Sequence, residues 1–106
     1  MIKVVILQSD DEILNIKISG HANSGEYGHD LVCAGVSSVV FGTLNSLEEV
    51  ERAFKIKLNE EKGLTEITPL YRPSHKNKIV LEVLITSLKT IAESYGDYIK
   101  IREERK

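Results

Sequence analysis

The sequence has few of the features that hold small secreted, metal-bound or membrane proteins together. Its single cysteine, Cys33, excludes an internal disulfide and a cysteine-rich zinc site. Uninterrupted apolar runs, such as residues 4–7 and 39–41, are far too short to span a bilayer. Neither sign of charge dominates, because 14 basic and 16 acidic residues give a formal net charge of −2. This balance argues against a dedicated nucleic-acid binder.

The sequence does contain enough apolar material for one core. Its 106 residues are 42% hydrophobic and fit one compact domain, residues 1–106. The first residues alternate like a strand and do not show the basic stub and apolar segment of a secretory signal. We therefore expect a single-domain cytoplasmic protein that does not associate with a membrane.

Hydrophobic periodicity predicts seven elements. Five segments are β-branched or alternate with period two, which predicts strands over residues 2–8, 13–19, 54–60, 64–69 and 98–102. Apolar residues spaced by three and four predict one helix from Leu31 to a solvated last turn near Arg52, and another over residues 79–95. The order ββαββαβ predicts an α+β fold, with a mostly antiparallel sheet and two helices packed on one face.

Residues 20–30 show no apolar period and predict an irregular loop, a kind of segment that often carries function. Asp30 is the expected N-cap of the first helix, which would make Cys33 about its third residue. There the exposed N–H groups and the helix dipole favour a thiolate, the nucleophilic form of cysteine. An imidazole nearby, from His21 or His29, could activate it. Asp30 and Ser37 lie three residues before and four after Cys33, on the same helix face.

Other interpretations of these residues are also open. Cys33 could be a small buried apolar residue, and Asp30 only a helix cap. His21, His29 and Cys33 could bind zinc, although three ligands spread over a loop, with no second pair, give a weak pattern.

Several short motifs resemble the signature of one known family, the ribosomal-processing cysteine proteases (Prp or YsxB-like). The family pattern is Gly-His-Ala, a glycine-containing loop, and Asp-hydrophobic-Val-Cys-Ala-x-Val-Ser. The matching segments are Gly20-His21-Ala22, Glu26-Tyr27-Gly28, Asp30-Leu31-Val32-Cys33-Ala34 and Val36-Ser37. The resemblance covers essentially the whole chain in length and element order. Asn23 stands where glycine is common and Gly35 where alanine is common, and neither departure removes a reactive group.

The resemblance implies a thiol protease that removes the N-terminal extension of a large-subunit ribosomal protein through an acyl-enzyme. By matching position, Cys33 would be the nucleophile, His21 the general base, and Asp30 and Ser37 supporting residues. The family is typically a homodimer and needs neither metal nor cofactor. A direct nucleic-acid partner is not expected.

The predicted loop also suggests a substrate cover. Its residues Gly20, Gly25, Tyr27 and Gly28 have little apolar area to hold them in place, and Tyr27 is the only large side chain among them. We expect the loop to become ordered when a peptide lies across Cys33.

A rival interpretation is a non-catalytic domain that binds ribosomal proteins or ribosome assembly intermediates. Its contact surface would be the basic connection over residues 71–78, which contains no acidic residue.

Overall fold

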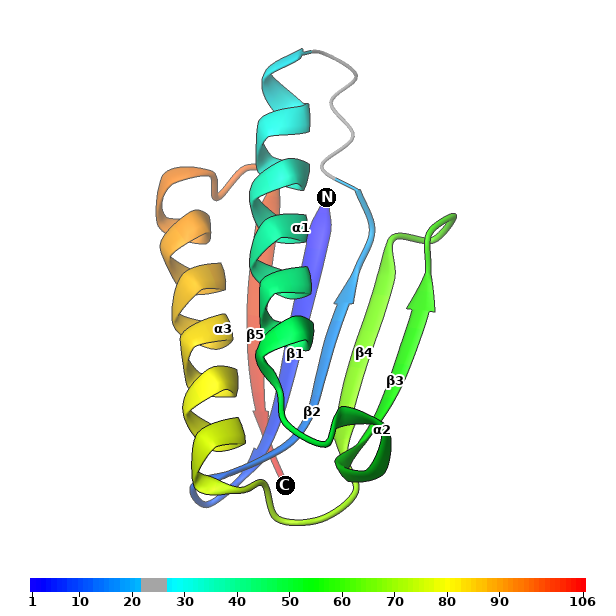
Figure 1. Cartoon of the computed structure of the whole chain (residues 1–106). Helices are drawn as coiled ribbons and strands as arrows, with labels where there is room; N and C mark the ends of the chain where they lie inside the picture. The colour runs from blue at the N-terminus through cyan, green and yellow to red at the C-terminus, as the bar shows by residue number, and fades with distance from the viewer. Residues whose placement is uncertain (22–26) are drawn as a thin grey trace.

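A five-stranded sheet with the strand order β3-β4-β2-β1-β5 forms the centre of the molecule (Figure 1). The computed structural model describes residues 1–21 and 27–106, and of residues 27–30 it describes the main chain. The strands are β1 (Ile2–Ser9), β2 (Glu12–Ser19), β3 (Phe54–Asn59), β4 (Leu64–Pro69) and β5 (Ile99–Arg105). The helices are α1 (Tyr27–Ser46), α2 (Val50–Ala53) and α3 (His75–Ser94).

The strand pairing confirms a mostly antiparallel sheet. The pairs β1–β2, β2–β4 and β3–β4 are antiparallel, and β1 pairs with β5 in parallel. The parallel pair arises because the chain crosses over through α3 before it returns as β5 (Figure 1). The predicted order ββαββαβ is also confirmed, with the four-residue α2 as a short addition before β3.

One face of this sheet is buried under the two long helices, as predicted (Figure 1). In β1, the side chains of Ile2, Val4 and Ile6 are buried and alternate with more exposed neighbours. This period-two burial is what a strand covered on one side requires. The inward side chains of the sheet meet one stripe of each helix, and together they form the core. Its helical members are Val32, Val36, Val40, Leu81, Leu84, Ile85 and Leu88.

The limits of the first helix differ from the prediction. It begins at Tyr27, so Asp30 lies inside the helix and is not its N-cap. Apolar spacing marks where a helix is buried, and a helix already nucleated extends at little cost beyond its buried stripe. The helix ends at Ser46, six residues before Arg52, and Glu49 then adopts a left-handed conformation (φ 48°) that separates α1 from α2.

The second long helix also begins before its first apolar residue. It starts at His75, four residues before the predicted position, because the Ser74 side chain caps it by accepting a hydrogen bond from the Asn77 main-chain N–H at 3.2 Å. Residues 75–78 of the predicted basic connection are therefore helical. Among the described residues, no helix has the length and apolar character needed to cross a membrane.

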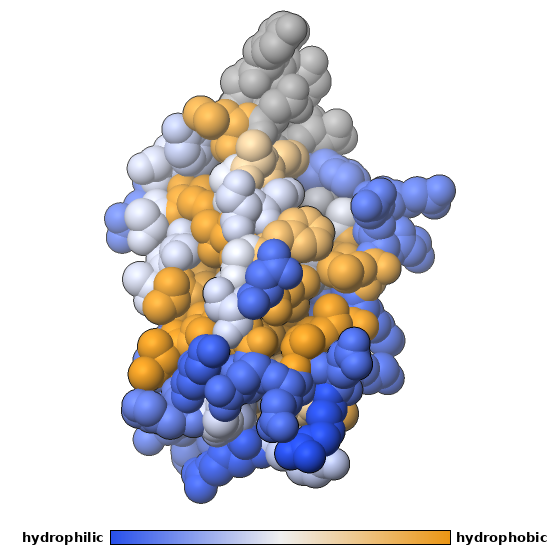
Figure 2. Space-filling view, in the orientation of Figure 1, coloured by the Kyte–Doolittle hydropathy of each residue, from blue (hydrophilic) through white to orange (hydrophobic). Residues whose placement is uncertain are grey.

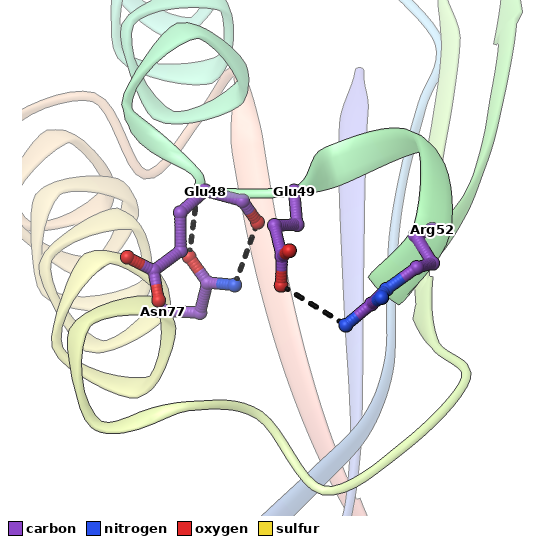
Figure 3. A network of polar contacts seen from close by, with 4 residues as sticks. All are labelled: Glu48, Glu49, Arg52 and Asn77. Carbon is purple, nitrogen blue, oxygen red and sulfur yellow. Dashed lines mark hydrogen bonds and ion pairs between the residues drawn. The ribbon is translucent and has the colours of Figure 1, made fainter.

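Asn77 joins α3 to the segment between α1 and α2 (Figure 3). Its side chain is only 2% exposed. The carboxamide accepts from the Glu48 main-chain N–H at 2.9 Å and donates to the Glu48 carbonyl at 3.0 Å. Because one buried amide satisfies both main-chain groups of Glu48, it fixes the point at which α1 stops.

The Asn77→Ala substitution should lower the free energy of unfolding by about 1–3 kcal/mol, because it removes the partner of two part-buried main-chain groups of Glu48. Asn45→Ala is the matched control, since Asn45 is exposed on α1 and should change stability by less than about 0.5 kcal/mol. Urea denaturation followed by circular dichroism measures both. Equal stabilities for the two variants would contradict the role assigned to Asn77.

Candidate active site

A groove of about 400 Å³ opens beside α1, and the β3–β4 hairpin forms its opposite side. Figure 2 shows apolar side chains gathered between these elements on the helix-covered side of the molecule. The start of β1 and the end of β2 complete the walls. The lining residues come from four parts of the chain: Ile2; Ile18, Gly20 and His21; Cys33, Val36, Ser37, Val40 and Phe41; and Leu58, Asn59, Glu60, Gly63, Leu64 and Thr65.

Cys33 enters the groove from α1. It is half-buried, packs against the core and lines the groove. Because α1 begins at Tyr27, Cys33 is the seventh helical residue and not the third. The helix start lies about 9 Å away along the axis at 1.5 Å per residue. The expectation that the first helical N–H groups surround the thiol is therefore wrong, since these groups end within the first turn.

His21 follows β2 directly, and its exposed ring lines the same groove. The ring nitrogen Nε2 lies 3.2 Å from the main-chain carbonyl oxygen of Glu61. A carbonyl only accepts hydrogen bonds, so this contact requires the proton on Nε2. In the neutral ring, Nδ1 is then the unprotonated nitrogen, the form a general base needs. The main-chain nitrogen of Met1 donates to the His21 carbonyl and restrains the residue further.

Two glycines allow the close approach that places His21. Gly20 N–H donates to the Lys62 carbonyl at 3.2 Å, which brings the β3–β4 turn against the end of β2. A Cβ atom on Gly63 would lie 2.3 Å from the Gly20 carbonyl oxygen and 3.0 Å from Cε1 of His21. Gly63 also has a φ of +58°, a conformation that favours glycine. A side chain at this position would therefore push the imidazole or the turn away.

The structure brings together only part of the predicted site. His21, Cys33 and Ser37 all line the groove, and Ser37 follows Cys33 by one helical turn. Tyr27, Gly28, His29 and Asp30 belong to α1, so the predicted loop over residues 20–30 is too long at its C-terminal end. Their side chains lie outside the described structure, as do Gly25 and the other residues from 22 to 26. The expected ordering of this loop on a bound peptide stays a prediction.

The sequence predicts the strands of the β3–β4 hairpin but gives no sign that the hairpin belongs to the site. In the structure, Glu61 in its turn provides the carbonyl that contacts His21, and Gly63 provides the space for the ring. Glycine in the turn was the one available signal. The main-chain contact itself leaves no side-chain pattern in the sequence.

A second, larger groove of about 1020 Å³ lies between α3 and the ends of β1, β2 and β5. Charged side chains line it, and ion pairs between Arg72 and Glu12 (2.5 Å) and between Lys89 and Glu103 (2.6 Å) cross it. No cysteine or histidine lines this groove. Within the described part of the chain, no three histidine, cysteine or acidic side chains are grouped to hold a metal ion. Of the two grooves, only the one beside α1 is lined by a described cysteine and a described histidine, Cys33 and His21.

Comparisons with known proteins identify the family of the chain. Residues 1–100 match the family model described as cysteine protease Prp. Curated relatives named ribosomal processing cysteine protease Prp include one from Staphylococcus aureus, 35% identical over 95% of this chain and 97% of its own length. Another, from Bacillus subtilis, is 37% identical over 95% of this chain and 96% of its own.

Solved structures of the S. aureus protease Prp share the fold. A complex with a covalently linked product peptide has a TM-score of 0.87 and 32% identity, and covers 98% of this chain and 100% of the solved one. A complex with a substrate peptide has a TM-score of 0.79 and 31% identity, with the same coverage.

The Gly63→Ala substitution should displace the His21 ring and lower the free energy of unfolding by more than about 1 kcal/mol, because the new Cβ meets main-chain atoms. Gly42→Ala on α1 is the matched control: its Cβ would have no neighbour within 4 Å, and it should stabilise the helix by up to about 1 kcal/mol. Urea denaturation measures stability, and the NMR resonance of the His21 Cε1–H reports the ring. An unshifted His21 resonance in Gly63→Ala would show that Gly63 does not position it.

Proposed function

Because the chain belongs to the Prp family of cysteine proteases, we propose that it removes the N-terminal extension of a large-subunit ribosomal protein. The observation that carries this proposal is that Cys33 and His21, from segments on opposite sides of the 22–26 stretch, line one groove. An extended chain end fits an open groove of this kind. The names of the relatives and the peptides bound to the S. aureus protease support a ribosomal protein as substrate.

The proposed reaction begins at the sulfur of Cys33. His21 Nδ1 takes the thiol proton, and Sγ attacks the scissile carbonyl carbon. The tetrahedral intermediate collapses to a thioester on Cys33, and His21 returns the proton to the leaving amine. Water, deprotonated by the same ring, then attacks the thioester carbonyl; the acyl product leaves, and His21 returns that proton to Sγ of Cys33. Each step uses one proton and one base, so no metal or redox partner is needed for the balance.

The carbonyl of Glu61 is the third member of this arrangement. In a cysteine–histidine pair, the base must present the correct nitrogen, and a third group usually fixes its tautomer and orientation. Glu61 O, 3.2 Å from His21 Nε2, suits this role. The side chain of Asp30, which the family resemblance also makes a supporting residue, remains a second candidate for orienting the ring.

The groove also suggests how the substrate is held. Leu58 and Phe41 line it and expose 54% and 50% of their surface, which is apolar area that a bound peptide would cover. The hydroxyl of Ser37, one turn after Cys33 and exposed in the groove, supplies a hydrogen-bond donor for the peptide main chain. We assign Ser37 this supporting role.

We also propose that the protein acts in the cytoplasm as a homodimer, as the family resemblance implies. Residues 31–46 of α1 contain no charged side chain, and Leu31 there is 63% exposed. An uncharged exposed helix face supports contact with a second copy. Light scattering in solution should give twice the mass of one chain, and a monomer at micromolar concentration would contradict the proposal.

The Cys33→Ala substitution should abolish cleavage of a large-subunit ribosomal protein that carries an N-terminal extension, because no nucleophile remains. The fold should persist, since a small side chain replaces a small one. Mass spectrometry of the substrate measures the cleavage, and Ser38→Ala, an exposed change on the same helix, is the control that should retain it. Continued processing by Cys33→Ala would refute the protease mechanism. Alkylation of the Cys33 thiol should likewise abolish cleavage, whereas it should not affect a protein that only binds its partner.

The His21→Ala substitution should lower kcat by about 10²–10⁴-fold, the usual contribution of a general acid–base group. His75→Ala is the matched control, because His75 is exposed on α3 and does not line the groove. His29→Ala should also have little effect. Equal losses from His21→Ala and His29→Ala, with inhibition by a chelator, would instead indicate a metal site.

A further inference from the structure

The strand side chains that point away from the helices form a second surface, which we call the outer face of the sheet. They alternate with the core: Lys3 lies between the buried Ile2 and Val4, and Lys17 between the buried Ile16 and Ile18. The basic members of the outer face are Lys3, Lys17, Lys55, Lys57, Lys100 and Arg102, and the acidic members are Glu66 and Glu104.

The outer face is strongly basic although the protein is slightly acidic. Six basic and two acidic side chains give it a formal charge of +4. Since the whole chain carries −2, the remaining residues carry −6. The fold thus concentrates positive charge on the outer face, although the net charge of the whole chain is slightly negative.

The five lysines of this face take part in no ion pair among the described residues. All five are exposed. The two carboxylates are already engaged: Glu66 accepts from Asn15 Nδ2 at 3.1 Å, and Glu104 pairs with Arg102 at 3.1 Å. The excess positive charge is therefore available to a ligand.

The strand register places one pair of like charges side by side and leaves a single carboxylate between two other lysines. Lys3 lies directly opposite Lys100 in the β1–β5 pair, an arrangement that destabilises a sheet. Lys57 and Lys17 flank Glu66 from the strands on either side. Basic side chains thus extend from β3 to β5, across four interstrand spacings, or about 19 Å. An extended anion lying over this face would relieve their repulsion.

We propose that the outer face binds single-stranded RNA through its phosphates, without sequence preference. A phosphate backbone supplies a row of anions that matches a row of lysines. The outward positions of the five strands carry no aromatic side chain, so the face lacks a platform for base stacking and reads charge alone. The choice of RNA among polyanions rests on the proposed function, since a ribosomal protein meets RNA as it assembles.

RNA on the outer face would leave the catalytic groove open. Both long helices lie on the opposite side of the sheet (Figure 1), and the groove is on that side. One molecule could therefore hold RNA and cut a peptide at the same time, and a short peptide should be cleaved at the same rate with or without RNA.

Fluorescence anisotropy with a labelled RNA of about 20 nucleotides tests the proposal. If five phosphates are contacted, the logarithm of the binding constant should fall with the logarithm of salt concentration with a slope of about −3.5. The triple variant Lys3→Gln, Lys17→Gln, Lys100→Gln should bind at least about tenfold more weakly, with a slope smaller by about 2. The control is Lys62→Gln, Lys76→Gln, Lys78→Gln, which removes the same charge from the β3–β4 turn and from α3.

The control variant should lose much less affinity, and it also tests the rival basic segment over residues 71–78. Three results would overturn the proposal. The first is no RNA binding at about 50 mM salt, where phosphate contacts are strong. The others are an equal loss of RNA affinity in the two triple variants, and displacement of the RNA by polyglutamate at equal charge. Peptide cleavage is measured on the same samples. RNA binding without any cleavage would refute only the proposed protease function, and cleavage retained by the outer-face variant shows that its fold is intact.

Discussion

The burial of one side of the sheet under α1 and α3 is the constraint from which the rest of the molecule follows. It commits alternate strand residues to the core, so the polar strand residues are left on the opposite side. The helices do not cover the sheet evenly, and the uncovered space between α1 and the β3–β4 hairpin becomes the groove. The groove with Cys33 and His21 and the basic outer face thereby lie on opposite sides of the sheet.

Within the groove, the geometry depends on how closely two main-chain segments can approach. The end of β2 and the β3–β4 turn meet at Gly20 and Gly63, where the main chain of Gly20 leaves no room for a side chain on Gly63. This approach brings the Glu61 carbonyl within hydrogen-bond distance of His21 and so restrains the imidazole ring. Cys33 needs no such device, because α1 is held by the core on either side of it.

Much of the fold could be predicted from the sequence, because alternation and helical spacing directly reflect burial. The helix ends could not, since Tyr27–Asp30 and His75–Lys78 lie outside the apolar stripes, and the end of α1 depends on Asn77, a residue 29 positions from its partner Glu48. Cys33 and His21 were identifiable from the motif and were found in one groove. The contribution of Glu61 was not, because every residue carries a main-chain carbonyl, and Gly63 indicated only a turn and not its contact with His21. The basic outer face of the sheet also could not be predicted from the net charge, because net charge does not show how charged side chains are distributed over the surface.

The contact between His21 and the Glu61 carbonyl has an evolutionary consequence. Every amino acid carries the same carbonyl oxygen, so residue 61 is free to vary as long as the turn keeps its shape. Selection would act on the turn's length and on its glycine, and not on the identity of the residue that supplies the oxygen. Drift at position 61 is thus compatible with an unchanged mechanism, and a search for invariant polar side chains would overlook this member of the site.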